Sequence, residues 1–346
     1  MIYSMKAVEK HSETTAGDEF YFQWHITERC NQFCTHCYQT GNTVQELSLH
    51  DLLKIIEIME DAVSSWGKQG TLSITGGEPF IRHDELHALM QRLDNSNHFC
   101  YYDVLTNGSF ISEDEAESLT EHSRLRRVQV SLEGASAETN DEIRGAGSFE
   151  TTLKAIRNLR AHDIKVVVMM TITRQNKSQV PHVVDLLNRE GVFALSLERL
   201  IPEGHGADLK HLVLSPDELQ NLYNEIYQLS RNSHVRILMH RPLFAMIAPE
   251  DPSVGALCSA GNNALTIMPD GTVYPCRRLP IPIGNILTDG LFRIWYDSDV
   301  LWRLRDPANL NEKCRNCELH TQCRGCRAFA YIENGDYMAE DAQCWK

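Results

Sequence analysis

Apolar positions follow two alternating patterns between residue 20 and about residue 235. Short runs that are nearly continuous in apolar or β-branched residues are typical of strands buried on both faces. Longer stretches with apolar residues three or four positions apart are typical of amphipathic helices, and one of them covers residues 49–66. The predicted strands cover residues 21–26, 71–75, 101–106, 127–132, 166–173 and 193–200.

Capping residues mark the ends of several predicted helices. Ser48 stands where it can cap the helix 49–66, and Gly67 follows that helix. Ser112 and Glu115 form the pattern of a capping box, which predicts the start of another helix. The acidic residues of this second helix predict a face exposed to solvent.

Six strand–helix repeats predict parallel strands joined by right-handed crossovers. Because a closed barrel of this type needs eight strands, we predict an α/β fold that is an open, partial (β/α)6 barrel of the TIM type. Its active face should lie at the C-terminal ends of the strands. The predicted organisation is an N-terminal extension (1–19), the barrel (20–235), a proline-rich connector (236–257) and a small cysteine-rich domain (258–346).

Composition narrows the classes of partner. The 346 residues include 33 Lys and Arg against 47 Asp and Glu, and the net charge of −14 disfavours a protein that coats nucleic acid. No apolar run reaches the roughly 18 residues that would span a bilayer. The first residues lack the apolar core of a secretion signal. We therefore predict a cytoplasmic protein with neither a nucleic-acid nor a membrane partner.

The 11 cysteines are unusually distributed for disulfides. Three lie between residues 30 and 37, seven lie after residue 257, and Cys100 stands alone as an expected small buried side chain. Clustered cysteines in a cytoplasmic chain indicate metal ligands.

The first cluster, Cys30-x3-Cys34-x2-Cys37, directly follows the first predicted strand. Three thiolates on one loop can hold three irons of a [4Fe–4S] cluster and leave the fourth iron for a chelating substrate. A structural zinc site is the alternative, but zinc normally takes four ligands and no fourth is near.

This spacing, with His36 before the last cysteine, resembles the signature of the radical SAM superfamily. The resemblance implies that the open iron chelates the amino and carboxylate groups of S-adenosylmethionine (SAM). One electron, supplied by reduced flavodoxin or ferredoxin, would then cleave SAM to a 5′-deoxyadenosyl radical. The cofactor would carry the difficult step, and the protein would position it and exclude water.

The resemblance also implies a set of SAM contacts. Glu78 in a GGEP motif would pair with the methionine ammonium, and Arg144 would pair with the carboxylate. Taken singly, the GGEP motif is also explained as a turn, and Tyr38 as an ordinary packed tyrosine. The other three polar contacts are also explained as caps or surface ion pairs. The implied contacts are Tyr38, Gly76, Gly77, Glu78, Pro79, Ser131, Glu133 and Arg144. Arg199, Pro202 and Gly204 also resemble the family pattern, although a rigid loop equally explains the last two.

The second cysteine set begins at Cys258 and resembles the SPASM extension of radical SAM enzymes, which houses auxiliary [4Fe–4S] clusters. Taken alone, the stretch 314–326 would favour zinc. The resemblance implies an outer cluster held by Cys314, Cys317, Cys323 and Cys344. It implies an inner cluster held by Cys258, Cys276 and Cys326, for which no fourth ligand is identified.

Three functions follow from these motifs. The leading hypothesis is modification of a ribosomally made peptide or protein by crosslinking, thioether formation, epimerisation or oxidation. The second is decarboxylation or side-chain modification of a haem-type tetrapyrrole, whose carboxylates would need a basic cavity. Four arginines are available for such a cavity: Arg277, Arg278, Arg324 and Arg327. The third, an iron–sulfur or zinc scaffold, has no need of an open iron.

Two details refine the peptide hypothesis. In sulfatase-maturing relatives the place of Arg277 is occupied by an aspartate that serves as the base. The arginine here argues against that activity. Because the first cysteine is already residue 30, we expect any leader peptide to be recognised by a separate protein or by the barrel face.

Overall fold

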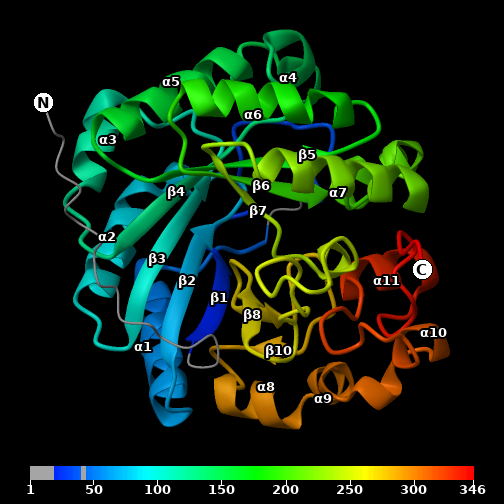
Figure 1. Cartoon of the computed structure of the whole chain (residues 1–346). Coiled ribbons are helices and arrows are strands. Elements are labelled where there is room, and N and C mark those ends of the chain that lie inside the picture. The colour runs from blue at the N-terminus through cyan, green and yellow to red at the C-terminus, as the bar shows by residue number, and fades with distance from the viewer. Residues whose placement is uncertain (1–18, 40–43) are drawn as a thin grey trace, which may run out of the picture.

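The computed structural model describes residues 19–39 and 44–346 (Figure 1). Apart from Glu19, the expected N-terminal extension lies outside the described residues. None of the helices in the described part of the chain is long and apolar enough to cross a membrane.

Six parallel strands, paired in sequence order, confirm the predicted α/β fold. Each begins and ends within two residues of its predicted bounds. They are β1 (Glu19–His25), β2 (Gln69–Thr75), β3 (Phe99–Thr106), β4 (Leu125–Ser131), β5 (Val166–Ile172) and β6 (Ala194–Arg199). A seventh parallel strand, β7 (Arg236–Leu238), pairs with β6 inside the region expected as a connector.

The helices that follow these strands lie on the outer side of the curved sheet (Figure 1). Ser48 caps α1 by accepting from the Asp51 amide, and Ser112 caps α3 by accepting from the Glu115 amide. The helices are α1 (Leu49–Ser65), α2 (His83–Asp94), α3 (Glu113–Leu119), α4 (Ala137–Arg144), α5 (Ser148–Ala161), α6 (Val180–Arg189) and α7 (Pro216–Ser230). Short 3-10 helices are η1 (Pro79–Arg82), η2 (Lys177–Gln179), η3 (Gly204–Leu212), η4 (Pro242–Met246) and η5 (Pro307–Asn309).

The two faces of β1 have different neighbours, because successive side chains of a strand point to opposite faces. Phe20, Phe22 and Trp24 are fully buried in the hydrophobic core, where the Phe20 ring lies 4.8 Å from the Trp66 ring. The other face carries Tyr21, and burial raises the pKa of Tyr21 to about 12. Asp103 and Cys276 add to this rise, while Ser73 and Arg241 oppose it. This second face lines the interior of the barrel, which we call the lumen.

The C-terminal region continues the same sheet. β8 (Ala264–Ile267) pairs in parallel with β1, and β9 (Thr272–Tyr274) and β10 (Gly284–Asn285) add antiparallel strands at that edge. The remaining helices are α8 (Leu291–Asp297), α9 (Asp299–Arg305), α10 (Glu312–Arg315) and α11 (Arg327–Asn334). Figure 1 shows α8 and α9 below β8 and β10, at this edge of the sheet. The domain boundaries proposed above remain a prediction.

A buried ion pair joins the barrel to the C-terminal segment. Arg199, at the end of β6, donates to both carboxylate oxygens of Asp341 at 3.0 and 2.8 Å and to Gln343 at 2.9 Å. Burial alone would raise the pKa of Asp341, but Arg199 outweighs it and holds that pKa below its ordinary value. Arg199, which resembled part of the SAM pattern, therefore connects two parts of the fold.

Replacing Arg199 with Ala should lower the free energy of unfolding by about 3–5 kcal/mol, because Asp341 would remain buried without its partner. Arg157→Ala is the matched control, because the Arg157 side chain is 59% exposed in its ion pair with Glu190. This substitution should lower the free energy of unfolding by only about 0–1 kcal/mol. Urea denaturation of the reconstituted protein measures both. Equal losses in the two variants would contradict the linking role of Arg199.

Candidate active site

The first cysteine loop follows β1 and has little apolar packing of its own. Phe33, its one large apolar side chain, is 83% exposed, and all three cysteines are half-buried. The loop is held instead by backbone hydrogen bonds to the end of β2. The Gly77 amide donates to the Thr27 carbonyl at 2.9 Å, and the Glu78 amide donates to the Arg29 carbonyl at 2.8 Å.

Gly76 and Gly77 are needed for this contact. A Cβ on Gly77 would lie 2.3 Å from the Arg29 carbonyl oxygen, and one on Gly76 would lie 2.5 Å from that of Thr27. The resemblance to radical SAM enzymes predicts both glycines as SAM contacts. The structure shows that the backbone of the cysteine loop is their nearest neighbour.

The loop after β6 supports the other end of the cysteine loop. The Gly206 amide donates to the Cys37 carbonyl at 3.0 Å. Gly204 has a φ of +59°, and a Cβ there would lie 2.4 Å from the Tyr38 carbonyl. Tyr38 itself lies under the Arg277 guanidinium, 4.8 Å from ring centroid to Cζ. Gly204 is therefore explained by contact with the cysteine loop.

Glu78 is fully buried, and its carboxylate joins the ends of β2 and β3. One oxygen accepts from the Phe80 amide at 3.1 Å and the Thr106 hydroxyl at 2.8 Å, and the other accepts from the Asn107 amide at 2.7 Å. Burial nevertheless raises the pKa of Glu78 to about 7. A cation beside this carboxylate would favour its ionised form. With about four lone-pair sites, it can accept one further donor.

Asn107 makes contacts with the cysteine loop that the sequence does not predict. Its side-chain amide donates to Asn31 at 2.9 Å and lies 3.8 Å from the Cys30 sulfur. Because its own backbone amide binds Glu78, Asn107 links the GGEP motif to the cysteine loop. No sequence motif marks it, since a single Asn after a strand is typical of turns.

Glu133 and Arg144 contact the cysteine loop from the opposite side. Glu133 is fully buried and accepts from Arg144 at 3.2 Å, while His36 lies 3.2 Å from the same oxygen. Burial opposes ionisation of Glu133, but His36 and Arg144 outweigh it and lower its pKa. Arg144 also donates to Gln32 at 3.0 Å. The residues on this side are thus held by one network.

Arg144 has one unused donor. Its Nε is buried and, among the described residues, has no hydrogen-bond partner, as is also true of the His36 Nδ1. A buried donor without a partner costs free energy, so this atom fits a ligand that brings an acceptor such as a carboxylate. Ser131, the last residue of β4, is half-buried at the same end of the sheet. Pro79 begins η1 directly after Glu78.

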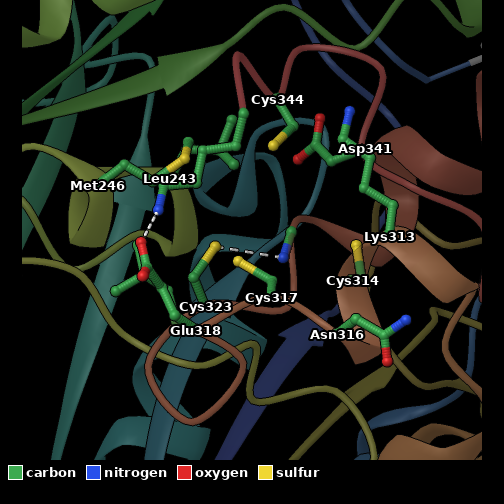
Figure 2. Close-up of a pocket in the computed structure, with 13 residues that line it drawn as sticks. Leu243, Met246, Lys313, Cys314, Asn316, Cys317, Glu318, Cys323, Asp341 and Cys344 are labelled. Atoms are coloured by element: carbon green, nitrogen blue, oxygen red, sulfur yellow. Dashed lines mark hydrogen bonds and ion pairs between the residues drawn. The ribbon is translucent and has the colours of Figure 1, made fainter.

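Four of the C-terminal cysteines surround one cavity of about 360 Å³. Figure 2 shows Cys314, Cys317, Cys323 and Cys344 around this space. All four thiols are free. This is the set that the sequence predicted for the outer cluster, and four thiolates lining one cavity suit an iron–sulfur cluster.

The remaining three cysteines lie close enough to influence one another. Burial raises the pKa of Cys258 to about 12, with Cys326 and Cys276 adding to the rise. Burial also raises the pKa of Cys276, again with a contribution from Cys326. The structure therefore brings together the three residues predicted for the inner cluster.

Only part of the expected basic cavity faces the lumen. Arg278 donates to Glu198 at 2.6 Å, and Arg241, which was not predicted, binds the same carboxylate. Arg327 instead donates to the carbonyls of Tyr337 and Ala339, inside the C-terminal domain. Arg324 is half-buried and donates to the His320 carbonyl. Arg278, Arg324 and Arg327 all lie close to a cysteine in sequence, and this proximity does not predict which of them faces the lumen.

His25, the last residue of β1, is fully buried on the lumen side of its strand. Among the described residues, neither of its ring nitrogens has a hydrogen-bond partner, and neither does the buried Nε of Arg277. Burial, with Arg277 second, holds the pKa of His25 well below its ordinary value, so the ring is neutral. A neutral imidazole offers one donor and one acceptor.

Comparison with known proteins decides the family. A model of the radical SAM superfamily matches residues 24–187, and a model of the SPASM iron–sulfur cluster-binding domain matches residues 258–318. The mycofactocin maturase of Mycobacterium tuberculosis is 32% identical over 93% of this chain and 81% of its own length. The chain belongs to the radical SAM superfamily.

Other similarities extend over nearly the whole chain of this radical SAM/SPASM enzyme. The AdoMet-dependent heme synthase of Methanosarcina barkeri is 29% identical over 93% of this chain and 95% of its own length. The structure of Streptococcus suis SuiB bound to precursor peptide SuiA has a TM-score of 0.76 at 18% identity. It covers 95% of this chain and 76% of that one, and it shows a shared fold.

As a radical SAM/SPASM enzyme, the chain takes SAM, a [4Fe–4S] cluster and auxiliary iron–sulfur clusters. When bound, SAM and the first [4Fe–4S] cluster would supply a 5′-deoxyadenosyl radical by reductive cleavage of SAM. We propose that Cys30, Cys34 and Cys37 hold the first cluster. In the same proposal, Glu78 receives the methionine ammonium and the unused Arg144 Nε receives its carboxylate.

Separate replacement of the cysteine sets should separate their roles. Anaerobically reconstituted protein should hold about twelve irons, and Ala at Cys30, Cys34 and Cys37 should leave about eight while abolishing SAM cleavage. Changing Cys317 or Cys344 should remove auxiliary iron and destabilise the C-terminal domain, because binding and folding are coupled there. Iron analysis and 5′-deoxyadenosine release measure these results. SAM cleavage that survives the triple change would contradict the assignment.

Glu78→Gln should weaken SAM binding roughly ten- to a hundredfold, since a charge-assisted hydrogen bond contributes about 1.5–3 kcal/mol. The amide also places a donor against the Asn107 or Thr106 donors. Equilibrium binding of SAM to the reconstituted protein measures the change, with cluster absorbance as the control for iron content. Wild-type affinity in Glu78→Gln would show that GGEP acts only as a turn.

Proposed function

We propose that this enzyme uses the 5′-deoxyadenosyl radical to modify a ribosomally made peptide or protein, by crosslinking, thioether formation, epimerisation or oxidation. Its relatives include the mycofactocin maturase at 32% identity. They also include the antilisterial bacteriocin subtilosin biosynthesis protein AlbA of Bacillus subtilis, at 28% over 92% of this chain and 70% of its own length. The fold is shared with SuiB, which has been solved with a precursor peptide bound.

The proposal rests on buried lumen atoms that have no hydrogen-bond partner among the described residues. His25 needs one donor and one acceptor, and the Arg277 Nε needs an acceptor. A peptide group supplies both an N–H and a C=O. An extended peptide that enters the lumen would supply partners for all three atoms, and Arg277, which follows Cys276, has its guanidinium over the Tyr38 ring.

A haem-type tetrapyrrole is the second candidate, favoured by the similarity to the AdoMet-dependent heme synthase of Methanosarcina barkeri over 95% of that protein's length. Arg241 and Arg278 both bind Glu198, so this group carries one net positive charge beside the lumen. That charge suits a substrate carboxylate. Ionised carboxylates, however, are acceptors only. They leave the acceptor nitrogen of His25 without a donor, so we place the peptide first.

The proposal includes two protein partners and a location. Reduced flavodoxin or ferredoxin would supply the electron, and a separate protein or the barrel face would bind any leader peptide. A cytoplasmic location suits thiols that are all free in the described part of the chain, because that compartment keeps thiols reduced.

A paired anaerobic assay distinguishes the two substrates. The reconstituted enzyme, with SAM and dithionite, receives either a short peptide encoded beside its gene or an iron porphyrin with propionate side chains. We expect a mass change in the peptide and 5′-deoxyadenosine release above the substrate-free level. Modification of the porphyrin alone would overturn the proposal.

His25→Phe should lower kcat/KM for the peptide roughly ten- to a hundredfold, because it fills the space but removes the hydrogen bonds, each worth about 1–3 kcal/mol when buried groups lose their partners. Substrate-free SAM cleavage and iron content should not change. His50→Gln, on the exposed surface of α1, is the control. Peptide turnover unaffected by His25→Phe would show that this histidine does not contact the substrate.

A further inference from the structure

Two histidines and a glutamate meet between α2 and α3, outside the cysteine clusters. His83 and His87 lie one turn apart on α2, and Glu115 lies in the first turn of α3. The Nε2 atoms of His83 and His87 each lie 3.0 Å from a different oxygen of Glu115. One ligand atom from each residue falls within 4.8 Å of the other two. Figure 1 shows α2 and α3 on the outer side of the sheet, away from the C-terminal region.

These separations suit a small divalent ion. Zinc binds His nitrogen and carboxylate oxygen at about 2.0–2.1 Å, so two ligands of a tetrahedral site lie about 3.3 Å apart. The two 3.0 Å contacts are close to that value, although they reach different oxygens of Glu115. One set of three ligand atoms lies within 4.8 Å, so a bound ion would draw these atoms together. Two imidazoles and one carboxylate favour Zn²⁺ or a similar transition metal over Mg²⁺ and Ca²⁺, which prefer oxygen ligands.

The His87 ring is already held in position through its other nitrogen. Its Nδ1 lies 3.0 Å from Nε2 of His122, whose Nδ1 lies 2.9 Å from Asp94. Asp94 is fixed in turn, since its other oxygen accepts from the Tyr102 hydroxyl and the Arg124 amide. If each ring donates along this chain toward Asp94, the lone pair of His87 Nε2 faces Glu115. Metal-binding histidines usually have such a partner.

His83 is arranged in the same way, with its Nδ1 3.2 Å from Asp84. Glu85, between the two histidines in sequence, is bound by Arg82 and takes no part. Glu115 is 10% exposed, which corrects the prediction that this acidic helix presents only a solvated face. The His83 side chain is 53% exposed, so a fourth position is accessible to water.

We propose that His83, His87 and Glu115 bind one Zn²⁺ or similar divalent transition-metal ion, with a water molecule as fourth ligand and His122 and Asp94 as supporting residues. The ion would join α2 to α3 on the outside of the barrel. The site shares no residue with the SAM or auxiliary-cluster sites, so SAM cleavage does not depend on it.

Zinc content of the fully reconstituted protein tests this site. After dialysis against micromolar Zn²⁺, elemental analysis should find one zinc per chain more in the wild type than in His83→Gln/His87→Gln or in Glu115→Gln. His50→Gln is the control, because it removes an exposed histidine from α1. Iron content and SAM cleavage should be equal in all four proteins, which also shows that the variants fold.

His122→Gln tests the supporting chain separately. Loss of such a partner typically weakens metal binding 10- to 100-fold, and competition with a zinc-chelating dye measures the affinity. Equal zinc content in the wild type and the double histidine variant would overturn the proposal. The cluster would then be a set of hydrogen bonds between two helices.

Discussion

The active site depends on close backbone contact between the first cysteine loop and the ends of two strands. The loop has almost no apolar side chains to bury, so its position comes from hydrogen bonds that allow no Cβ between the partners. Gly76 and Gly77 provide this at one end of the loop, and Gly204 provides it at the other. The loop is thus placed by the barrel itself, and a [4Fe–4S] cluster would bind to a loop that is already positioned.

Buried charges extend this positioning to the C-terminal region. Glu198 and Arg199 are neighbours on β6, and each binds a partner from a later part of the chain. Glu198 is bound by Arg278, which follows Cys276, and Arg199 is bound to Asp341, which precedes Cys344. Asp341 also accepts from the Cys326 amide at 2.8 Å. One strand end therefore contacts the surroundings of both auxiliary cysteine groups.

The strands and the cysteine sets could be predicted from the sequence, because each leaves a local pattern. Strands buried on both faces are continuous in apolar residues, and the cysteine spacings are short and regular. β8 is also buried, but it is only four residues long, and its pairing with β1 joins segments far apart in the chain. A local pattern carries no information about such a pairing.

Other features escaped prediction because their partners are distant. Asn107 and Gln32 have common polar side chains whose roles appear only when the strand ends meet. The spacing of His83 and His87 was visible in the sequence, but their third partner lies on a helix whose acidic residues predicted exposure. Arg327 lies next to Cys326, yet its guanidinium binds backbone carbonyls of the following loop instead of facing the lumen.

The pairing of β8 with β1 explains how two distant cysteine sets come to border one lumen. β1 leads into the first cysteine loop, and β9, which leads into Cys276, lies in the same sheet with only β8 between it and β1. Arg277, next to Cys276, stacks on Tyr38, next to Cys37. Arg277 also has the unused Nε that we assign to the substrate. A substrate bound there would touch the residue that joins the two cysteine sets, and it would lie between them.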